Sequence, residues 1–231
     1  NVNAHIPIVG DVKSVLREFT KEIEACPCDE WLKKVQAAKK EAPLRGEPRT
    51  DFVEPRAFMR DLSAMMEDDA ILTADVGQNQ IWAANNFNTK EGRFLTSGGM
   101  GTMGYALPAA IGAKLAKPKR QVVAVCGDGS FQMSMCELAT ANQNQVPLKL
   151  VVMRNKFLGM VKELQDNLYQ GRHVATPLNG DPDIVKLVQA YGIKAVFAQN
   201  NEDAKKLAKE MLESKEAYVL VCDVDPNTPS I

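Results

Sequence analysis

Two glycines flank an aspartate at the end of an apolar run, in a pattern suited to holding a charged ligand. Gly127-Asp128-Gly129 follows Cys126 directly and precedes Ser130. Glycines let a backbone pass close to a bulky anion, and the N–H groups at the start of a following helix point toward it. A carboxylate beside a phosphate repels it unless a divalent cation lies between them, and Mg2+ prefers hard oxygen ligands. Asp128 is therefore a candidate metal ligand.

A second polar side chain is expected to join this site. Asn155 lies 27 positions after Asp128, directly after the next apolar run at 148–153. Neighbouring parallel strands would bring the two side chains together, so that an amide oxygen and a carboxylate share one ion. Gly-Asp-Gly by itself is a common turn. The metal site is thus predicted from the whole order of strand, glycine loop, helix, strand and Asn.

The segments that must position these residues alternate between helices and apolar strands from Pro55 onward. Expected strands span 70–74, 121–126, 148–153, 194–197 and 218–223, and expected helices span 55–66, 78–85, 104–116, 132–144 and 202–213, with others near 159 and 183. The strands are apolar on both faces, as is typical where helices cover a parallel sheet on both sides. The pattern predicts a doubly wound α/β domain, whose ligands bind at the carboxyl ends of the strands.

The first 51 residues differ from the rest of the chain. A short strand at 6–11 and a helix at 12–25 are expected, followed by a charged segment at 26–51 that three prolines punctuate. We interpret 26–51 as a surface linker. The α/β domain is then predicted to span 52–231.

The bulk composition argues against several classes of partner. The chain has 28 Lys+Arg and 29 Asp+Glu, a net charge of -1, and no dense basic block to attract nucleic acid. It has no apolar run of about 18 residues that would cross a membrane. Its five cysteines, an odd number, favour a reducing, cytoplasmic setting. Cys26-Pro27-Cys28 lacks the usual spacing of a zinc site.

Several motifs together resemble one enzyme family. Gly127-Asp128-Gly129, followed after 25 residues by Asn155, resembles the signature of thiamin diphosphate (TPP) enzymes. The segments GQNQIWAA at 77–84, LTSGGMGTMG at 95–104, LPAAIGA at 107–113 and FLGMV at 157–161 look like the large subunit of acetolactate synthase (acetohydroxyacid synthase). The resemblance covers the chain essentially end to end. IVGDV at 8–12 looks like the end of the family's middle domain, which makes 1–25 a remnant of that domain.

The resemblance implies a role for each matched residue. The metal would be bound by the side chains of Asp128 and Asn155 and by the main-chain carbonyl of Phe157. The cofactor would contact Gln78, Asn79, Gly127, Gly129, Ser130, Gly159 and Met160 at its diphosphate, and Gly101 and Met103 at its aminopyrimidine. Met103 would also support the bent geometry that brings the pyrimidine toward the reactive carbon of the cofactor.

Three positions depart from the family's pattern. Arg154 replaces the first Asn of the family's Asn pair, while the metal-binding second Asn is kept. Asn79 stands where a His is common, so a phosphate contact is retained and a proton role is not expected. Leu164 stands where the biosynthetic enzymes carry a Trp that lines the substrate channel and favours 2-ketobutyrate. We therefore expect a weak preference among acceptors and poor binding of herbicides that block the channel.

Two other titratable residues are left out of the catalytic set. His173 follows the expected substrate loop, where a lone histidine is insufficient for an acid–base role. Glu137 lies about two helical turns beyond the glycine loop, and we expect it to make a structural hydrogen bond.

The resemblance implies decarboxylation of pyruvate and condensation with a second 2-oxo acid in branched-chain amino-acid biosynthesis. The family's essential Glu belongs to a pyrimidine-binding domain of a neighbouring subunit, which no stretch of this sequence resembles. The isolated chain is thus expected to be inactive. A homodimer or tetramer, a regulatory small subunit, and FAD bound mostly by other parts of the enzyme are also implied. Two alternatives stay open: another TPP-dependent 2-oxo acid decarboxylase or carboligase, and a non-catalytic assembly module.

Overall fold

The structure is a computed structural model that describes residues 3–41 and 51–231. Contacts within the chain divide it into two units, Asn1–Leu44 and Arg45–Ile231.

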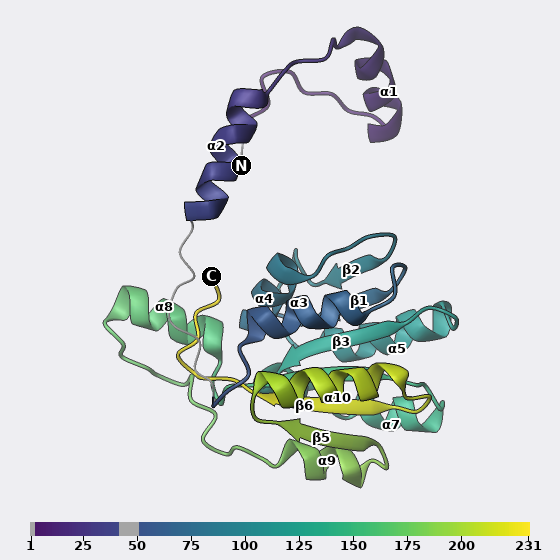
Figure 1. Ribbon diagram of the computed structural model, residues 1–231, viewed down its shortest axis with the longest axis vertical. Coiled ribbons are helices and arrows are strands. Elements are labelled where there is room, and N and C mark those ends of the chain that lie inside the picture. Colours follow the sequence, from purple (N-terminus) through teal and green to yellow (C-terminus); the bar gives the residue numbers. More distant parts are fainter. Residues whose placement is uncertain (1–2, 42–50) are drawn as a thin grey trace. The chain divides into compact units, whose positions relative to one another are not determined.

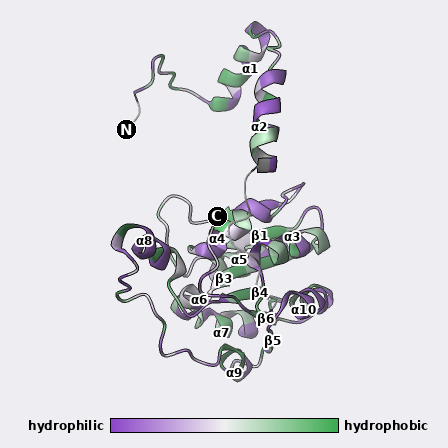
Figure 2. Ribbon diagram, turned by 60° about the vertical axis from the view of Figure 1, so that its left-hand side comes forward, coloured by the Kyte–Doolittle hydropathy of each residue, from purple (hydrophilic) through white to green (hydrophobic). Residues whose placement is uncertain are grey.

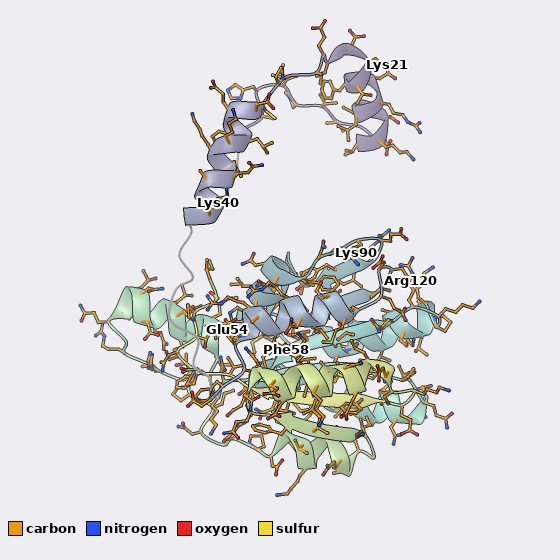
Figure 3. The ribbon with its side chains drawn as sticks, in the orientation of Figure 1. Lys21, Lys40, Glu54, Phe58, Lys90 and Arg120 are labelled. Atoms are coloured by element: carbon orange, nitrogen blue, oxygen red, sulfur yellow. The ribbon has the colours of Figure 1, made fainter. Side chains whose placement is uncertain are left out.

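The described residues of the first unit form two helices, α1 (Val12–Glu22) and α2 (Asp29–Glu41). Asp11 caps α1 by accepting a hydrogen bond from the Ser14 N–H at 2.9 Å. Lys21, which lies near the end of α1 (Figure 3), forms an ion pair with Glu18 at 2.8 Å. The helix ends at Glu22, three residues before the predicted end at position 25, because the backbone becomes extended at Ile23.

The short strand predicted at 6–11 is wrong. That segment has no regular structure, and Ile6, Ile8 and Val9 are exposed. The described residues of this unit form no strand for it to pair with, and an unpaired strand leaves its backbone groups to water. A short apolar run that ends in a turn was therefore not sufficient to predict a strand.

Part of the predicted linker is helical. Helix α2 lies inside the segment 26–51, and residues 42–50 of that segment lie outside the described residues. The division into a middle-domain remnant, a linker and a binding domain at 52–231 stays a prediction.

The second unit is built on one sheet of six parallel strands. They are β1 (Ile71–Ala74), β2 (Arg93–Thr96), β3 (Val122–Gly127), β4 (Lys149–Arg154), β5 (Lys194–Ala198) and β6 (Tyr218–Asp223). Their order is β2-β1-β3-β4-β6-β5 (Figure 1). The chain adds β2 on one side of β1 and then β3 on the other. The strand order thus reverses between β1 and β3, where ligands of doubly wound sheets bind.

Helices cover both faces of this sheet, which confirms the predicted doubly wound α/β fold. On one face lie α3 (Pro55–Met65), α4 (Gln78–Asn86) and α10 (Asn201–Glu213), and on the other lie α5 (Ala106–Ala116), α6 (Asp128–Ser134), α7 (Glu137–Gln143) and α9 (Ile184–Ala190). Along β3, Val123 and Val125 join the first core while Val122 and Ala124 join the second. Figure 2 shows the apolar central strands enclosed by helices with polar outer faces.

Local signals set the ends of α3. Glu54 precedes the helix and accepts hydrogen bonds from the Ala57 N–H at 2.7 Å and from Arg56 at 2.6 Å, while Pro55 occupies the first helical position. Phe58 is fully buried on the face toward the sheet (Figure 3). The predicted bounds of this helix were correct to within one residue.

Two elements differ from expectation. The single helix predicted at 132–144 is two helices, because hydrogen bonds of the tighter i→i−3 type, from Leu138 to Met135 and from Ala139 to Cys136, interrupt the regular pattern. Strand β2 was not predicted, since it is a four-residue edge strand without a fully buried side chain.

Among the described helices, none has the length and apolar character to cross a bilayer.

Candidate functional site

The glycine loop forms the turn from β3 into α6. Gly127 is the residue before α6, and its N–H donates to the Ser130 hydroxyl at 3.1 Å. A side chain at Gly129 would place its Cβ 2.8 Å from the end of the Leu158 side chain, which would have to shift to make room. Glycine at this position therefore keeps the loop backbone free of side-chain crowding.

The Asp128 carboxylate is buried at the start of this turn. Its side chain accepts the Lys156 N–H at 2.7 Å and the Gly129 N–H at 3.0 Å. Burial raises the pKa of Asp128 to about 6, against the lowering effect of these hydrogen bonds and of the Arg154 charge. The carboxylate thus occupies an environment where a bound cation would stabilise its charged form.

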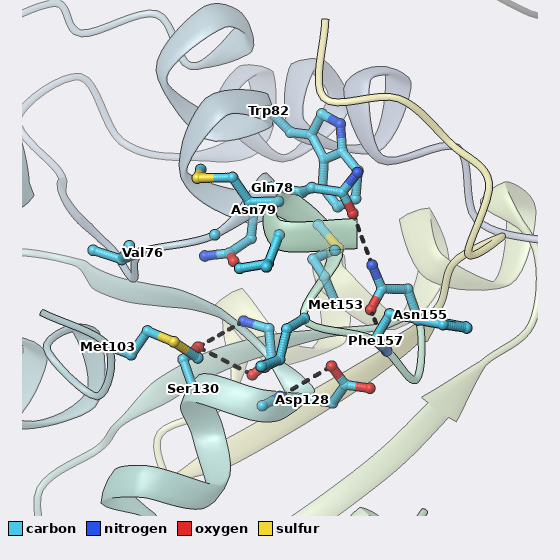
Figure 4. A pocket seen from close by; sticks show the side chains of 17 residues that line it. Val76, Gln78, Asn79, Trp82, Met103, Asp128, Ser130, Met153, Asn155 and Phe157 are labelled. Atoms are coloured by element: carbon cyan, nitrogen blue, oxygen red, sulfur yellow. Dashed lines mark hydrogen bonds between the residues drawn. The ribbon is translucent and has the colours of Figure 1, made fainter. Parts of the chain in front are cut away.

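Asn155 reaches the same place from the end of β4. The register pairs Gly127 with Met153, so the two strands end side by side. The Asn155 side chain is buried, donates to the Gln78 side chain at 2.8 Å and accepts from the Phe157 N–H at 3.1 Å (Figure 4). The predicted meeting of Asp128 and Asn155 at the carboxyl edge is therefore present.

Gln78 links this edge to the end of the chain. It lies at the start of α4, and its amide donates to the Thr228 carbonyl at 3.0 Å while its oxygen accepts from Asn155. Trp82, one turn further, donates to the Pro229 carbonyl at 2.9 Å. Both hydrogen bonds fix α4 against the segment after β6.

A cavity of about 100 Å³ opens between these elements, enough for several water molecules. Its lining includes the predicted residues Gln78, Asn79, Met103, Gly127, Asp128, Gly129, Ser130, Asn155, Phe157, Gly159 and Met160 (Figure 4). Two predicted residues lie outside that lining. Gly101 lies between two turns with φ +66°, and Leu164 is half exposed on α8 (Gly159–Tyr169).

The cavity also has lining residues that sequence reasoning missed. They are Val76, Gly77, Trp82, Met153, Leu158 and Val161. Val76 and Gly77 lie two and three residues after the end of β1, at the point where the strand order reverses, so the topology rule would have identified them. Trp82 follows Gln78 by one helical turn and shares its face of α4.

Asp75 is a further residue that sequence reasoning missed. It is buried after β1 and accepts N–H groups from Gly104 at 2.9 Å and Ala106 at 2.8 Å, and burial raises its pKa. Its main-chain carbonyl accepts from the Asn79 side chain at 2.8 Å. Asp75 thus fixes the glycine-rich segment that carries Met103 against the end of β1.

The donor set fits a magnesium ion bound together with phosphate. A buried carboxylate and a buried amide lie at one edge, next to the main chain of Phe157, and these are hard oxygen donors. In the part of the chain that the structure describes, no group of three or more His, Cys, Asp or Glu residues is placed to hold a metal. A cation here would need oxygens from a bound phosphate or from water to complete its coordination, as Mg2+ usually does.

The two residues left out of the catalytic set lie elsewhere. Glu137 accepts a hydrogen bond from the Thr140 hydroxyl at 2.8 Å, the structural contact expected of it. The ring of His173 lies 2.6 Å from Asp166 and packs edge-on against Phe157. Neither residue lines the cavity.

Comparison with known proteins places these features in a family. Residues 75–222 match the family model described as "Thiamine pyrophosphate enzyme, C-terminal TPP binding domain". The chain is 40% identical to the probable acetolactate synthase large subunit of Methanocaldococcus jannaschii, covering 98% of this chain and 40% of that protein. It is 38% identical to the acetolactate synthase isozyme 3 large subunit of Escherichia coli, covering 92% and 38%, respectively. The chain thus spans about two fifths of the length of these relatives.

Proposed function

Because this chain contains the C-terminal TPP-binding domain of the thiamine pyrophosphate enzymes and so belongs to that family, we propose that it is the diphosphate-binding part of an acetolactate synthase. The observation that carries the proposal is the cavity where the glycine loop, Asn155 and Gln78 converge at the carboxyl ends of β1, β3 and β4. The relatives named above carry the acetolactate synthase description.

In this proposal Asp128, Asn155 and the Phe157 carbonyl hold Mg2+, and the diphosphate lies along Gln78, Asn79, Gly127, Gly129, Ser130, Gly159 and Met160. The glycines allow the close approach, and the cation offsets the repulsion between Asp128 and the phosphates. Met103 and Gly101 contact the pyrimidine. Bound TPP supplies the electron sink for decarboxylation of a 2-oxo acid such as pyruvate, while these residues bind it, orient it and exclude water.

The rest of the pocket comes from elsewhere in the proposed assembly. Several large apolar side chains are exposed on segments that also carry cavity residues: Met100, three residues before Met103, and Val161, Leu164, Leu168 and Tyr169 on α8. A pyrimidine-binding domain of a neighbouring subunit, in a homodimer or tetramer, would cover them and provide the essential Glu. A regulatory small subunit, FAD and a cytoplasmic location belong to the same proposal.

The isolated chain is expected to bind TPP weakly, because only half of the pocket is present. It should bind TPP only with Mg2+, because the cation offsets the repulsion between Asp128 and the phosphates. Adding TPP at ten times its Kd with Mg2+ should raise the melting temperature by about 3–5 °C. The same addition with a chelator should have no effect. Supplied with pyruvate, this chain should form neither acetolactate nor acetaldehyde. The proposal would be contradicted if TPP with Mg2+ left the melting temperature unchanged, or if the isolated chain made acetolactate without any partner.

Replacing Leu164 by Trp should restore acceptor preference in the intact enzyme. Leu164 is half exposed on α8, three residues after the cavity residue Val161. A Trp ring narrows the channel and adds contacts to the larger acceptor, with an effect of about 1–3 kcal/mol. We expect the preference for 2-ketobutyrate over pyruvate to rise about tenfold, as measured by competition between the two acceptors.

Leu115 provides the matched control for this substitution. It lies on α5, is 58% exposed and does not line the cavity, so Leu115→Trp adds the same ring away from the site. An equal change of preference in both variants would exclude a specific role for Leu164.

A further inference from the structure

Two residues near the site have a backbone conformation that residues other than glycine rarely adopt. Lys156 has φ +62° and Asp181 has φ +30°, both in the left-handed region. Such conformations persist where the surrounding contacts determine them, and they concentrate at functional sites. The two residues are joined to each other, because Lys156 Nζ lies 3.0 Å from Asp181 Oδ2.

The conformation of Lys156 determines where the groups of the site point. Lys156 stands between Asn155 and Phe157, and its own N–H donates to Asp128 Oδ2 at 2.7 Å. Its carbonyl accepts the Leu178 N–H at 2.8 Å, which fixes this turn against the segment that leads to Asp181. A rotation of this one residue would move Asn155 and Phe157 relative to each other and break the hydrogen bond to Asp128.

Asp181 also holds the residue on the other side of Asn155. Arg154 Nη2 lies 2.7 Å from each carboxylate oxygen of Asp181, and Nε lies 3.0 Å from Oδ1. The remaining nitrogen of this guanidinium donates to Asp223 at 2.6 Å. Forked pairs of this kind fix orientation as well as adding energy. Arg154 is only 17% exposed, so solvent screens the pair incompletely.

We propose that Asp181 is a positioning residue for the magnesium site, acting through Arg154 and Lys156 on the Asn155–Phe157 turn between them. One carboxylate holds both neighbours of Asn155 and so sets the direction of the metal-binding groups. Arg154, where this chain departs from the family's Asn pair, is one of the two residues through which Asp181 acts. This inference rests on the proposed function, since it presumes that Mg2+ binds with TPP at this turn.

The test is Asp181→Asn compared with Asp183→Asn in the same 231-residue chain. Asp183 lies two residues away and caps α9, and an Asn caps a helix equally well, so the control makes the same charge change in the same segment. The probe is Mg2+, titrated at a fixed TPP concentration with the melting temperature as the signal. Removing a residue that orients metal ligands typically weakens metal affinity about 10–100-fold.

We expect the Mg2+ midpoint of Asp181→Asn to rise at least about tenfold, and that of Asp183→Asn to stay at the wild-type value. At saturating Mg2+ the TPP affinity of Asp181→Asn should return to that of the wild type. A purely structural role would instead lower the melting temperature without ligand and weaken TPP binding at every Mg2+ concentration, which would overturn the inference.

Two further outcomes separate this inference from the proposed function. A wild type that binds TPP with Mg2+, together with an unchanged midpoint in Asp181→Asn, would overturn only the positioning role. A wild type without any response to TPP and Mg2+ would overturn both. Should Asp181→Asn fail to fold, Asp181→Glu retains the carboxylate and its midpoint should lie above that of Asp183→Asn; equal midpoints would overturn the inference.

Discussion

Replacing Asp128 by Asn should abolish Mg2+-dependent TPP binding and yet stabilise the unliganded chain above pH 6. The substitution removes the one carboxylate of the proposed metal site and keeps the shape of the side chain. An amide oxygen is a weaker ligand than a carboxylate and does not offset the cation's charge. We expect the apparent affinity for TPP with Mg2+, measured from the melting temperature, to fall at least about 100-fold, more than for residues that only orient the ligands.

The stability change follows from the burial of this carboxylate. Burial raises the pKa of Asp128 to about 6 in the folded chain, from an ordinary value of 3.8. The unfolded chain therefore releases the proton at lower pH, and stability falls as pH rises from about 4 to about 6. A shift of about 2 units corresponds to roughly 3 kcal/mol, and losing a hydrogen bond from Lys156 or Gly129 offsets about 1 kcal/mol of it.

Asp128→Asn should thus be more stable than the wild type by about 1–2 kcal/mol at pH 8, and this advantage should vanish at pH 4. Denaturant unfolding at both pH values measures the difference. The control is again Asp183→Asn, because this exposed carboxylate has its pKa lowered by its contacts with Lys186 and gains nothing from neutralisation. A variant that retains full TPP binding would remove Asp128 from the metal site.

The chain order of strands and loops was enough to predict the core of this site. Apolar runs on both faces indicated a parallel sheet, and the carboxyl ends of parallel strands meet at one edge. That placed Asp128 beside Asn155, which are far apart in the sequence. The individual roles given to Gln78, Met103 and Gly159 came from family resemblance and stay predictions, although all three line the cavity.

The parts that sequence reasoning missed depend on long-range packing. Asp75 followed an apolar run as Asp128 does, but its partners, Gly104 and Ala106, lie about 30 residues away and no local pattern connects them. The Arg154–Asp181 pair similarly joins a strand end to a loop. At the start of the chain a local pattern misled instead: the short apolar run at 6–11 predicted a strand, but the described residues around it provide no strand for it to pair with.

Replacing Gly159 by Ala should disrupt the site from a position that has no side chain of its own. The new Cβ would lie 1.9 Å from Gln78 Oε1 and 2.7 Å from Asn155 Nδ2. Because Oε1 is the end of a flexible side chain, Gln78 can rotate away and the fold survives. That rotation breaks the hydrogen bonds of Gln78 to Asn155 and to the Thr228 carbonyl. Losing such buried contacts costs about 1–3 kcal/mol.

We expect Gly159→Ala to lower the free energy of unfolding by this amount and to weaken TPP binding at least about tenfold, since both Gln78 and Asn155 leave their positions. Gly112→Ala is the matched control. Gly112 lies inside α5, a Cβ at this position would meet no atom within 4 Å, and Ala favours a helix over Gly by about 1 kcal/mol. The same substitution should therefore stabilise the chain in α5 and destabilise it in α8.

A double-mutant cycle identifies Gln78 as the cause. In a Gln78→Ala background the side chain that meets the new Cβ is gone, so Gly159→Ala should lose most of its effect on unfolding. The TPP response should stay weak in the double variant, because the proposed contact of Gln78 is still missing. Equal costs of Gly159→Ala in both backgrounds would mean that Asn155 or the helix start of α8, and not Gln78, sets the requirement for glycine.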